Sequence, residues 1–171
     1  MQIRSKKLPK VVADTIEDQC YKIPWLFQKD GTYANHEGRK KFPCFTMLLC
    51  QEPNERTQHY DFFPWQYIDG ASLMSSRKKK RAHVALQLPN PKKFNSPHNI
   101  HVDYVTPHDV LLYYINDADG DTFFFDDQEN VIHRETPQKG KMIIFDGSIP
   151  HASSSPSEDF RFILNICYER T

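Results

Sequence analysis

Short runs in which apolar and polar residues alternate fill the second half of the chain. They cover residues 81–88, 99–104, 110–116, 121–126, 131–136 and 141–146, a brief piece around His151, and residues 161–169. Turn-forming residues such as Pro89-Asn90-Pro91, Gly120 and Gly147 separate these runs. Eight short strands at this spacing are typical of an antiparallel barrel or jelly roll, so the pattern predicts a mainly β fold.

The first 80 residues carry helical as well as strand-like patterns. We expect a short amphipathic helix over residues 9–22, a strand from Phe42 to Cys50, and a second helix within residues 61–76 that begins near Pro64. Leu73 fits the apolar face of the second helix poorly. Both helices are expected to cover the outer face of a sheet, which is a packing role and not a catalytic one.

The candidate chemistry centres on His101 and Asp103, which are two residues apart in the run 99–104. If that run is a strand, both side chains leave the same face. His151 follows later in the chain and can complete a set of two histidines and one carboxylate, which leaves open positions on a non-haem Fe(II) ion. The alternative is a chance His–Asp pair without a catalytic role, because the chain has eight histidines.

Arg161 begins the last strand-like run. Arg161, Ile163, Asn165 and Cys167 share one face of this run, and the opposite face is formed by Phe162, Leu164, Ile166 and Tyr168. The apolar face suits packing against covering helices, so the face with Arg161 points into the barrel. A guanidinium buried there requires an anionic partner, and its planar fork suits a carboxylate. The alternative is a surface arginine, whose ion pairs contribute little to stability.

The order of these motifs resembles the Fe(II)/2-oxoglutarate-dependent dioxygenases, in particular their prolyl-4-hydroxylase-like branch. After the HxD motif, that branch has a Tyr-Leu-Asn-Asp segment, a Gly-Gly-Glu-Thr turn, a Gly-x-x-x-x-Phe-Asp strand, and then His and Arg. This chain has Tyr114-Ile115-Asn116-Asp117, Asp119-Gly120-Asp121-Thr122, Gly140 through Phe145-Asp146, His151 and Arg161. The match covers about residues 81–171, and Pro24-Trp25-Leu26-Phe27 resembles small phage-encoded members.

The resemblance implies a double-stranded β-helix, that is, a jelly-roll or cupin-like barrel, with N-terminal covering helices. It assigns Fe(II) to His101, Asp103 and His151, and the distal carboxylate of 2-oxoglutarate to Arg161 and the Tyr114 hydroxyl, with Thr122 nearby. Leu112 shares a face with Tyr114, and Asn165 shares one with Arg161, so both are further candidates for the co-substrate pocket. O2 is the second co-substrate, and a need for ascorbate stays open. The implied reaction hydroxylates an amino-acid, peptide or protein substrate, with proline among the candidates, and releases succinate and CO2.

Bulk composition narrows the partners and the compartment. Lys plus Arg number 22 and Asp plus Glu also number 22, so the formal net charge of zero gives no electrostatic argument for general nucleic-acid or membrane binding. The length of 171 residues suits one domain, in which residues 1–80 support a barrel core at 81–171 that carries the site. Four cysteines without CxxC pairing and a start without an apolar signal region lead us to expect a soluble, cytoplasmic protein with free thiols.

Two other functions stay open. The basic run 77–81 could contact phosphates, which would suit a nucleic-acid-modifying 2-oxoglutarate oxygenase, although such a run is usually a solvated face. A non-catalytic, cupin-like metal-binding module could hold Zn or Ni with the same three ligands. His98, His108 and His133 are expected to be ordinary polar residues. Phe123, Phe124 and Phe125 could limit solvent access at the mouth of the site, and they would serve equally well as core.

Overall fold

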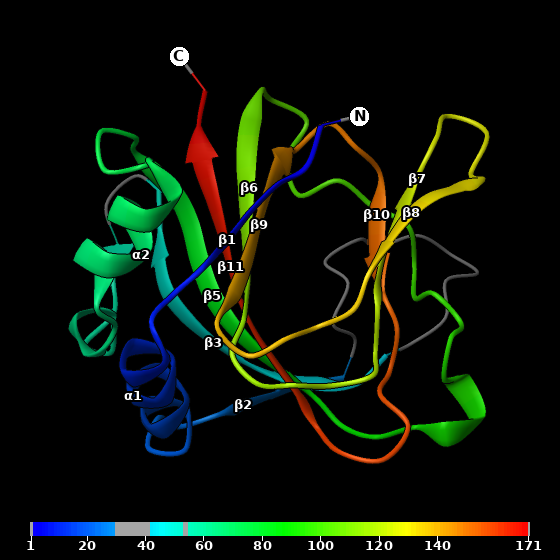
Figure 1. Ribbon diagram of the computed structural model, residues 1–171, viewed down its shortest axis with the longest axis horizontal. Helices are drawn as coiled ribbons and strands as arrows, with labels where there is room; N and C mark the ends of the chain where they lie inside the picture. Colours follow the sequence, from blue (N-terminus) through cyan, green and yellow to red (C-terminus); the bar gives the residue numbers. More distant parts are fainter. Residues whose placement is uncertain (1, 30–41, 53–54, 171) are drawn as a thin grey trace.

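Two antiparallel sheets face each other in the computed structural model, which describes residues 2–29, 42–52 and 55–170 (Figure 1). The larger sheet has eight strands in the order β1-β9-β6-β11-β5-β3-β2, with β4 paired to β3, and the smaller has the order β10-β7-β8. This arrangement confirms the expected double-stranded β-helix. The strands are β1 (Arg4–Lys7), β2 (Leu26–Gln28), β3 (Cys44–Gln51), β4 (Glu55–Arg56), β5 (Lys79–Gln87), β6 (His108–Tyr114), β7 (Thr122–Phe125), β8 (Val131–Glu135), β9 (Lys141–Asp146), β10 (His151–Ser153) and β11 (Arg161–Glu169).

Both expected helices are present and cover the outer face of the larger sheet, as predicted (Figure 1). The first, α1 (Lys10–Cys20), follows Pro9, and the second, α2 (Trp65–Ser72), follows Pro64. Both pack on the apolar face of β11, which is completely or almost completely buried. Leu73 adopts a left-handed conformation, ends α2 and is 74% exposed, which explains why it fits the apolar face poorly. Two short 3-10 helices span Tyr60–Phe62 and Pro91–Lys93.

The strand expected over residues 99–104 is wrong. Within this segment only His101 forms a β-bridge, an isolated pairing with His151. His101 and His151 exchange both backbone N–H···O=C bonds, each at 3.0 Å. Pro97, two residues before the segment, has no backbone N–H to donate, so a regular ladder does not continue into the segment from that side.

Besides the core between the helices and the larger sheet, the inner faces of the two sheets enclose an apolar cluster, which includes Val110, Leu112, Tyr114, Phe124 and Phe145. Phe123 and Phe125 form a separate small cluster with Ala152. The three consecutive phenylalanines are therefore core residues. Among the helices in the described part of the chain, none has the length and apolar character needed to cross a lipid bilayer.

Candidate functional site

His101, Asp103 and His151 lie together, with one ligand atom from each within 4.8 Å of the others. His151 begins β10, and the backbone bridge to His101 brings the two rings to a centroid distance of 4.8 Å. Each Nδ1 atom is bonded to a backbone carbonyl two residues earlier, His101 to Asn99 at 2.9 Å and His151 to Ile149 at 3.0 Å. Because a carbonyl oxygen only accepts, both Nδ1 atoms carry the proton, and both Nε2 lone pairs are left for a metal ion.

The electrostatics of this cluster favour the protonation states that a cation needs. Burial opposes the ionisation of Asp103, but the Arg81 guanidinium and the neighbouring imidazoles hold its pKa well below the usual range. Burial, together with the nearby His101, lowers the pKa of His151 to about 4. At neutral pH the site therefore offers the Asp103 carboxylate and a neutral His151 imidazole, as metal binding requires. The donor set fits Fe(II), and one side of the cluster opens into a cavity.

Arg81 is a site residue that the sequence reasoning missed, because it was placed in a solvated basic run. The side chain is buried on the inner face of β5 and donates a hydrogen bond to Asp103 Oδ1. Lys79, two residues earlier, points to the other side of the sheet, where its Nζ lies 2.5 Å from Asp69, because the pairing of β5 with β11 shifts register between Arg81 and Lys79. The alternation of side chains along β5 could have identified Arg81. Ala82, Val84 and Leu86 are apolar and face the outer core, so the odd-numbered positions from Arg81 onward face the cavity.

A second set of candidate donors, Asp103, His108 and Cys167, meets the same distance criterion. Burial strongly raises the pKa of the Cys167 thiol, and the Arg81 guanidinium lies 3.8 Å from its sulfur. A protonated thiol beside a fixed positive charge is a poor place for a cation. His108 donates from Nδ1 to the Thr106 carbonyl at 2.8 Å and begins β6, where its expected role as an ordinary polar residue stays a prediction.

Arg161 lies at the other end of the cavity and is completely buried. Its Nη1 donates to Gln87 Oε1 at 3.0 Å and its Nη2 donates to Thr122 Oγ1 at 2.9 Å, while Nε is buried without a partner. The Tyr114 hydroxyl also donates to Thr122 Oγ1, at 2.9 Å. Among the described residues no carboxylate forms an ion pair with Arg161. Burial lowers the pKa of Arg161, because desolvation disfavours the charged guanidinium. The guanidinium points inward, as the sequence predicts, and a buried positive charge at this position calls for an anionic partner.

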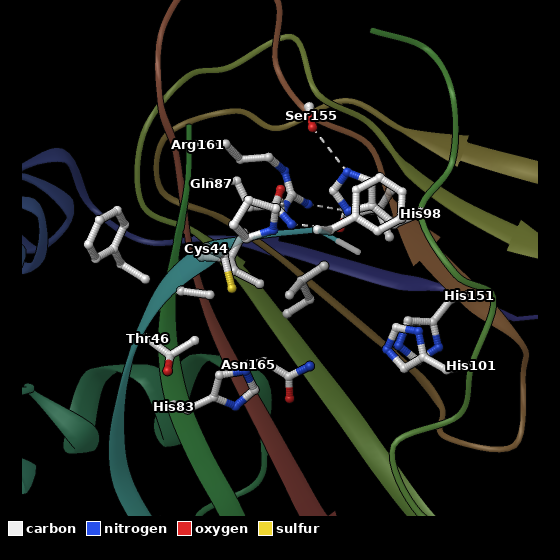
Figure 2. Close-up of a pocket in the computed structure, with 18 of the residues that line it drawn as sticks. Cys44, Thr46, His83, Gln87, His98, His101, His151, Ser155, Arg161 and Asn165 are labelled. Atoms are coloured by element: carbon white, nitrogen blue, oxygen red, sulfur yellow. Dashed lines mark hydrogen bonds between the residues drawn. The ribbon is translucent and has the colours of Figure 1, made fainter. Parts of the chain in front are cut away.

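Gln87 extends this arrangement into a chain of hydrogen bonds along the cavity wall (Figure 2). Arg161 determines the orientation of the Gln87 side-chain amide, because a guanidinium only donates and so must face Oε1. Nε2 of Gln87 then donates to Ser153 Oγ at 2.7 Å. Ser153 Oγ in turn shares a hydrogen bond with Nδ1 of His98 at 3.1 Å, and Nε2 of His98 shares one with Ser155 Oγ at 3.1 Å. His98 therefore lines the cavity with both nitrogens occupied, which is consistent with the expectation that it is no metal ligand.

The cavity between these two ends has a volume of about 710 Å³. The predicted co-substrate residues Leu112, Thr122, Arg161 and Asn165 line it, whereas Tyr114 reaches it only through Thr122. Aromatic residues from the N-terminal half, Phe27, Phe42 and Phe45, contribute to its wall. Sequence reasoning assigned these residues no function, because no motif marks them.

Comparison with known proteins supports the fold and leaves the substrate open. Neither a protein-family model nor a curated protein matches the sequence. The structure is similar to an oxidoreductase of the 2OG-Fe(II) oxygenase family from Burkholderia pseudomallei, with a TM-score of 0.70 and 13% identity over 98% of this chain and 85% of that one. It is also similar to a prolyl-4-hydroxylase from Pseudomonas putida, with a TM-score of 0.62 and 16% identity over 98% and 92% of the two chains.

A third solved structure is a prolyl hydroxylase from Trichoplax adhaerens in complex with a peptide fragment of hypoxia inducible factor. Its TM-score is 0.66, with 12% identity over 97% of this chain and 82% of that one. At these identities the likeness establishes the fold. The motif resemblance to 2-oxoglutarate-dependent oxygenases is thus confirmed at the level of the fold.

Proposed function

We propose that this protein is an Fe(II)- and 2-oxoglutarate-dependent dioxygenase that hydroxylates an amino-acid or peptidyl substrate and releases succinate and CO2. One observation carries the proposal: a single cavity contains both a His/Asp/His set with free Nε2 atoms and a buried arginine without an acidic partner. The first fits a divalent cation and the second fits a carboxylate. A dicarboxylic acid that also chelates the metal satisfies both.

Each part of the cavity has a separate task in this reaction. His101, Asp103 and His151 would hold Fe(II), which together with 2-oxoglutarate and O2 supplies the oxidising chemistry that converts a C–H bond to C–OH. The fork of Arg161 and the hydroxyl of Thr122 would receive the distal carboxylate.

Apolar wall residues between the two ends, including Leu112, Phe145 and Ile163, exclude water from the bound co-substrate. Gln87 would keep the Arg161 fork in one orientation, because it occupies Nη1 at the edge of the cavity. The wall combines strands from both halves of the chain, which supports treating residues 1–171 as one functional unit.

An amino-acid or peptide substrate is favoured over a nucleic acid. The basic run that could contact phosphates is paired with carboxylates, Lys78 with Glu52 at 2.6 Å and Arg81 with Asp103. A peptide occupies one of the structurally similar prolyl hydroxylases. A purely structural metal module has no need for a buried arginine that faces the cavity.

The test is an anaerobic titration of the Fe(II)-loaded protein with 2-oxoglutarate. A visible metal-to-ligand charge-transfer band is expected, followed by succinate release when O2 and a substrate are supplied. The screen covers capped amino acids, peptides and oligonucleotides, each with and without ascorbate, and Asp103→Ala is the control that should give no band. A folded, metal-loaded wild-type protein that shows no band with 2-oxoglutarate would refute the proposal.

A further inference from the structure

Three polar side chains gather on the wall of the cavity away from Arg161. They come from adjacent strands of the larger sheet: Thr46 from β3, His83 from β5 and Asn165 from β11 (Figure 2). His83 and Asn165 are direct cross-strand partners. Thr46 pairs with Ala85, which makes it a diagonal neighbour of His83 on the same face of the sheet. We call Thr46, His83 and Asn165 the polar triad.

The polar triad has hydrogen-bonding capacity that the described residues leave unused. His83 Nδ1 is buried and has no hydrogen-bond partner. Asn165 makes only long contacts, from Nδ2 to Asp103 Oδ2 at 3.3 Å and from the Cys167 thiol to Oδ1 at 3.5 Å. A buried nitrogen without a partner is unfavourable, and the rest of the partly exposed His83 ring lines the cavity, where a ligand can reach it.

The proposed co-substrate leaves the polar triad unoccupied, so Asn165, a candidate for the co-substrate pocket from its strand position, is assigned to the prime substrate instead. One carboxylate of 2-oxoglutarate is assigned to Arg161 and its other end to the metal ligands. The apolar cross-strand pair Ala85 and Ile163 separates the polar triad from Gln87 and Arg161. Along β5, His83 and Gln87 are four residues apart, which corresponds to about 13 Å of strand. A ligand that contacts His83 is therefore not 2-oxoglutarate. The remaining candidate is the prime substrate, the molecule that is oxidised.

The polar triad also lies beside the metal cluster, because Asn165 contacts a carboxylate oxygen of Asp103. A group bound there would be held next to the reacting position. Burial and the adjacent Arg81 guanidinium lower the pKa of His83 to about 3, so its ring is neutral at physiological pH. A neutral imidazole, a hydroxyl and an amide together offer both donors and acceptors.

We propose that Thr46, His83 and Asn165 form a subsite that binds an uncharged amide of the prime substrate, as found in a peptide backbone, next to the C–H bond to be hydroxylated. This inference rests on the proposed function. An amide presents one N–H and one C=O, which match the mixed donors and acceptors of the polar triad. Arg81 lies on the same face of β5, two residues from His83, and disfavours an ammonium or guanidinium group at this position.

The experiment uses the full chain loaded with Fe(II) and 2-oxoglutarate under anaerobic conditions. The probes are N-acetyl amino-acid amides with uncharged side chains, and thymidine as a nucleobase control. Binding is measured as a perturbation of the charge-transfer band. The capped amides are expected to bind, and thymidine is expected not to bind.

Variants of the polar triad connect this binding to the named residues. His83→Leu should weaken amide binding about tenfold while the dissociation constant for 2-oxoglutarate stays unchanged, and His83→Gln should restore part of the affinity. Thr46→Val tests the same subsite from another strand if His83→Leu does not fold. His133→Leu is the matched control, because His133 lies on β8 outside the cavity wall.

Several outcomes would overturn the subsite alone. These are unchanged amide binding in both His83→Leu and Thr46→Val, an absence of binding by every uncharged amide, and binding of thymidine in place of amides. A parallel loss of 2-oxoglutarate affinity in His83→Leu would move His83 to the co-substrate pocket and would also overturn it. Absence of the charge-transfer band in the wild-type protein would instead reject the proposed function, and the subsite with it.

Discussion

Replacement of Arg161 by methionine is the most direct test of the co-substrate pocket. The substitution keeps a long side chain in a completely buried position and removes the charged group that we assign, together with the Thr122 hydroxyl, to the distal carboxylate. Hydrogen bonds to charged groups contribute about 1.5–3 kcal/mol each. A two-point contact at the low end of this range is worth about 3 kcal/mol, so the dissociation constant for 2-oxoglutarate should rise by about 150-fold.

The assay is ligand-induced stabilisation, measured as the free energy of unfolding with and without 2-oxoglutarate in the presence of Mn(II). At a ligand concentration of 100 times the wild-type dissociation constant, the wild-type protein should gain about 2.7 kcal/mol. The variant should gain only about 0.3 kcal/mol under the same conditions, because its site is less than half occupied. Mn(II) affinity should be unchanged, since Arg161 shares no hydrogen bond with the three metal ligands.

The matched control is Arg4→Met, which removes an exposed guanidinium from β1. It should keep the full stabilisation by 2-oxoglutarate. The reasoning is refuted if Arg161→Met also keeps the full stabilisation, or if Mn(II) affinity falls together with 2-oxoglutarate affinity.

Three further predictions concern the cavity wall, the turn at Gly120 and two buried histidines. Gln87→Glu should place a carboxylate against Arg161 and weaken 2-oxoglutarate binding by about tenfold or more, measured from the charge-transfer band; unchanged affinity would contradict the idea that Gln87 orients the guanidinium. Gly120→Ala should destabilise the protein by about 1–3 kcal/mol in urea unfolding, because the new Cβ would lie 2.7 Å from a backbone carbonyl oxygen; equal midpoints would show that this turn can relax. Burial lowers the pKa of both His83 and His98 to about 3, so the unfolded chain takes up protons first as the pH falls below 6.5. The free energy of unfolding should therefore fall by about 1 kcal/mol for each of these histidines between pH 7.5 and pH 5.5, and the double variant with leucine at both positions should lose less over that interval.

Local patterning was sufficient to predict most of the secondary structure. The alternation in residues 161–169 separated a face for the covering helices from a face that carries Arg161, and both faces are placed as expected. This worked because the side-chain period of a strand is two, and one face must be apolar to pack against a helix. The same rule applied to β5 would have placed Arg81, His83 and Gln87 on the inner face.

The metal cluster shows a different relation between sequence and structure. His101, Asp103 and His151 were selected by residue type and order, and they do lie together. The expected reason, a continuous strand that carries the first two, is wrong. The segment is held by a single bridge between His101 and His151, which are 50 residues apart in the sequence.

By itself, the sequence determined which positions alternate, where turns and helices begin, and which side chains could bind a metal ion or a carboxylate. Only the tertiary structure decided that Arg81 pairs with Asp103, that Gln87 orients Arg161, and that Nδ1 of His83 has no hydrogen-bond partner among the described residues. The physical reason is that strand periodicity and turn preferences act between near neighbours in the chain. Burial and hydrogen bonding across the cavity depend instead on which distant strands pair, and in which register.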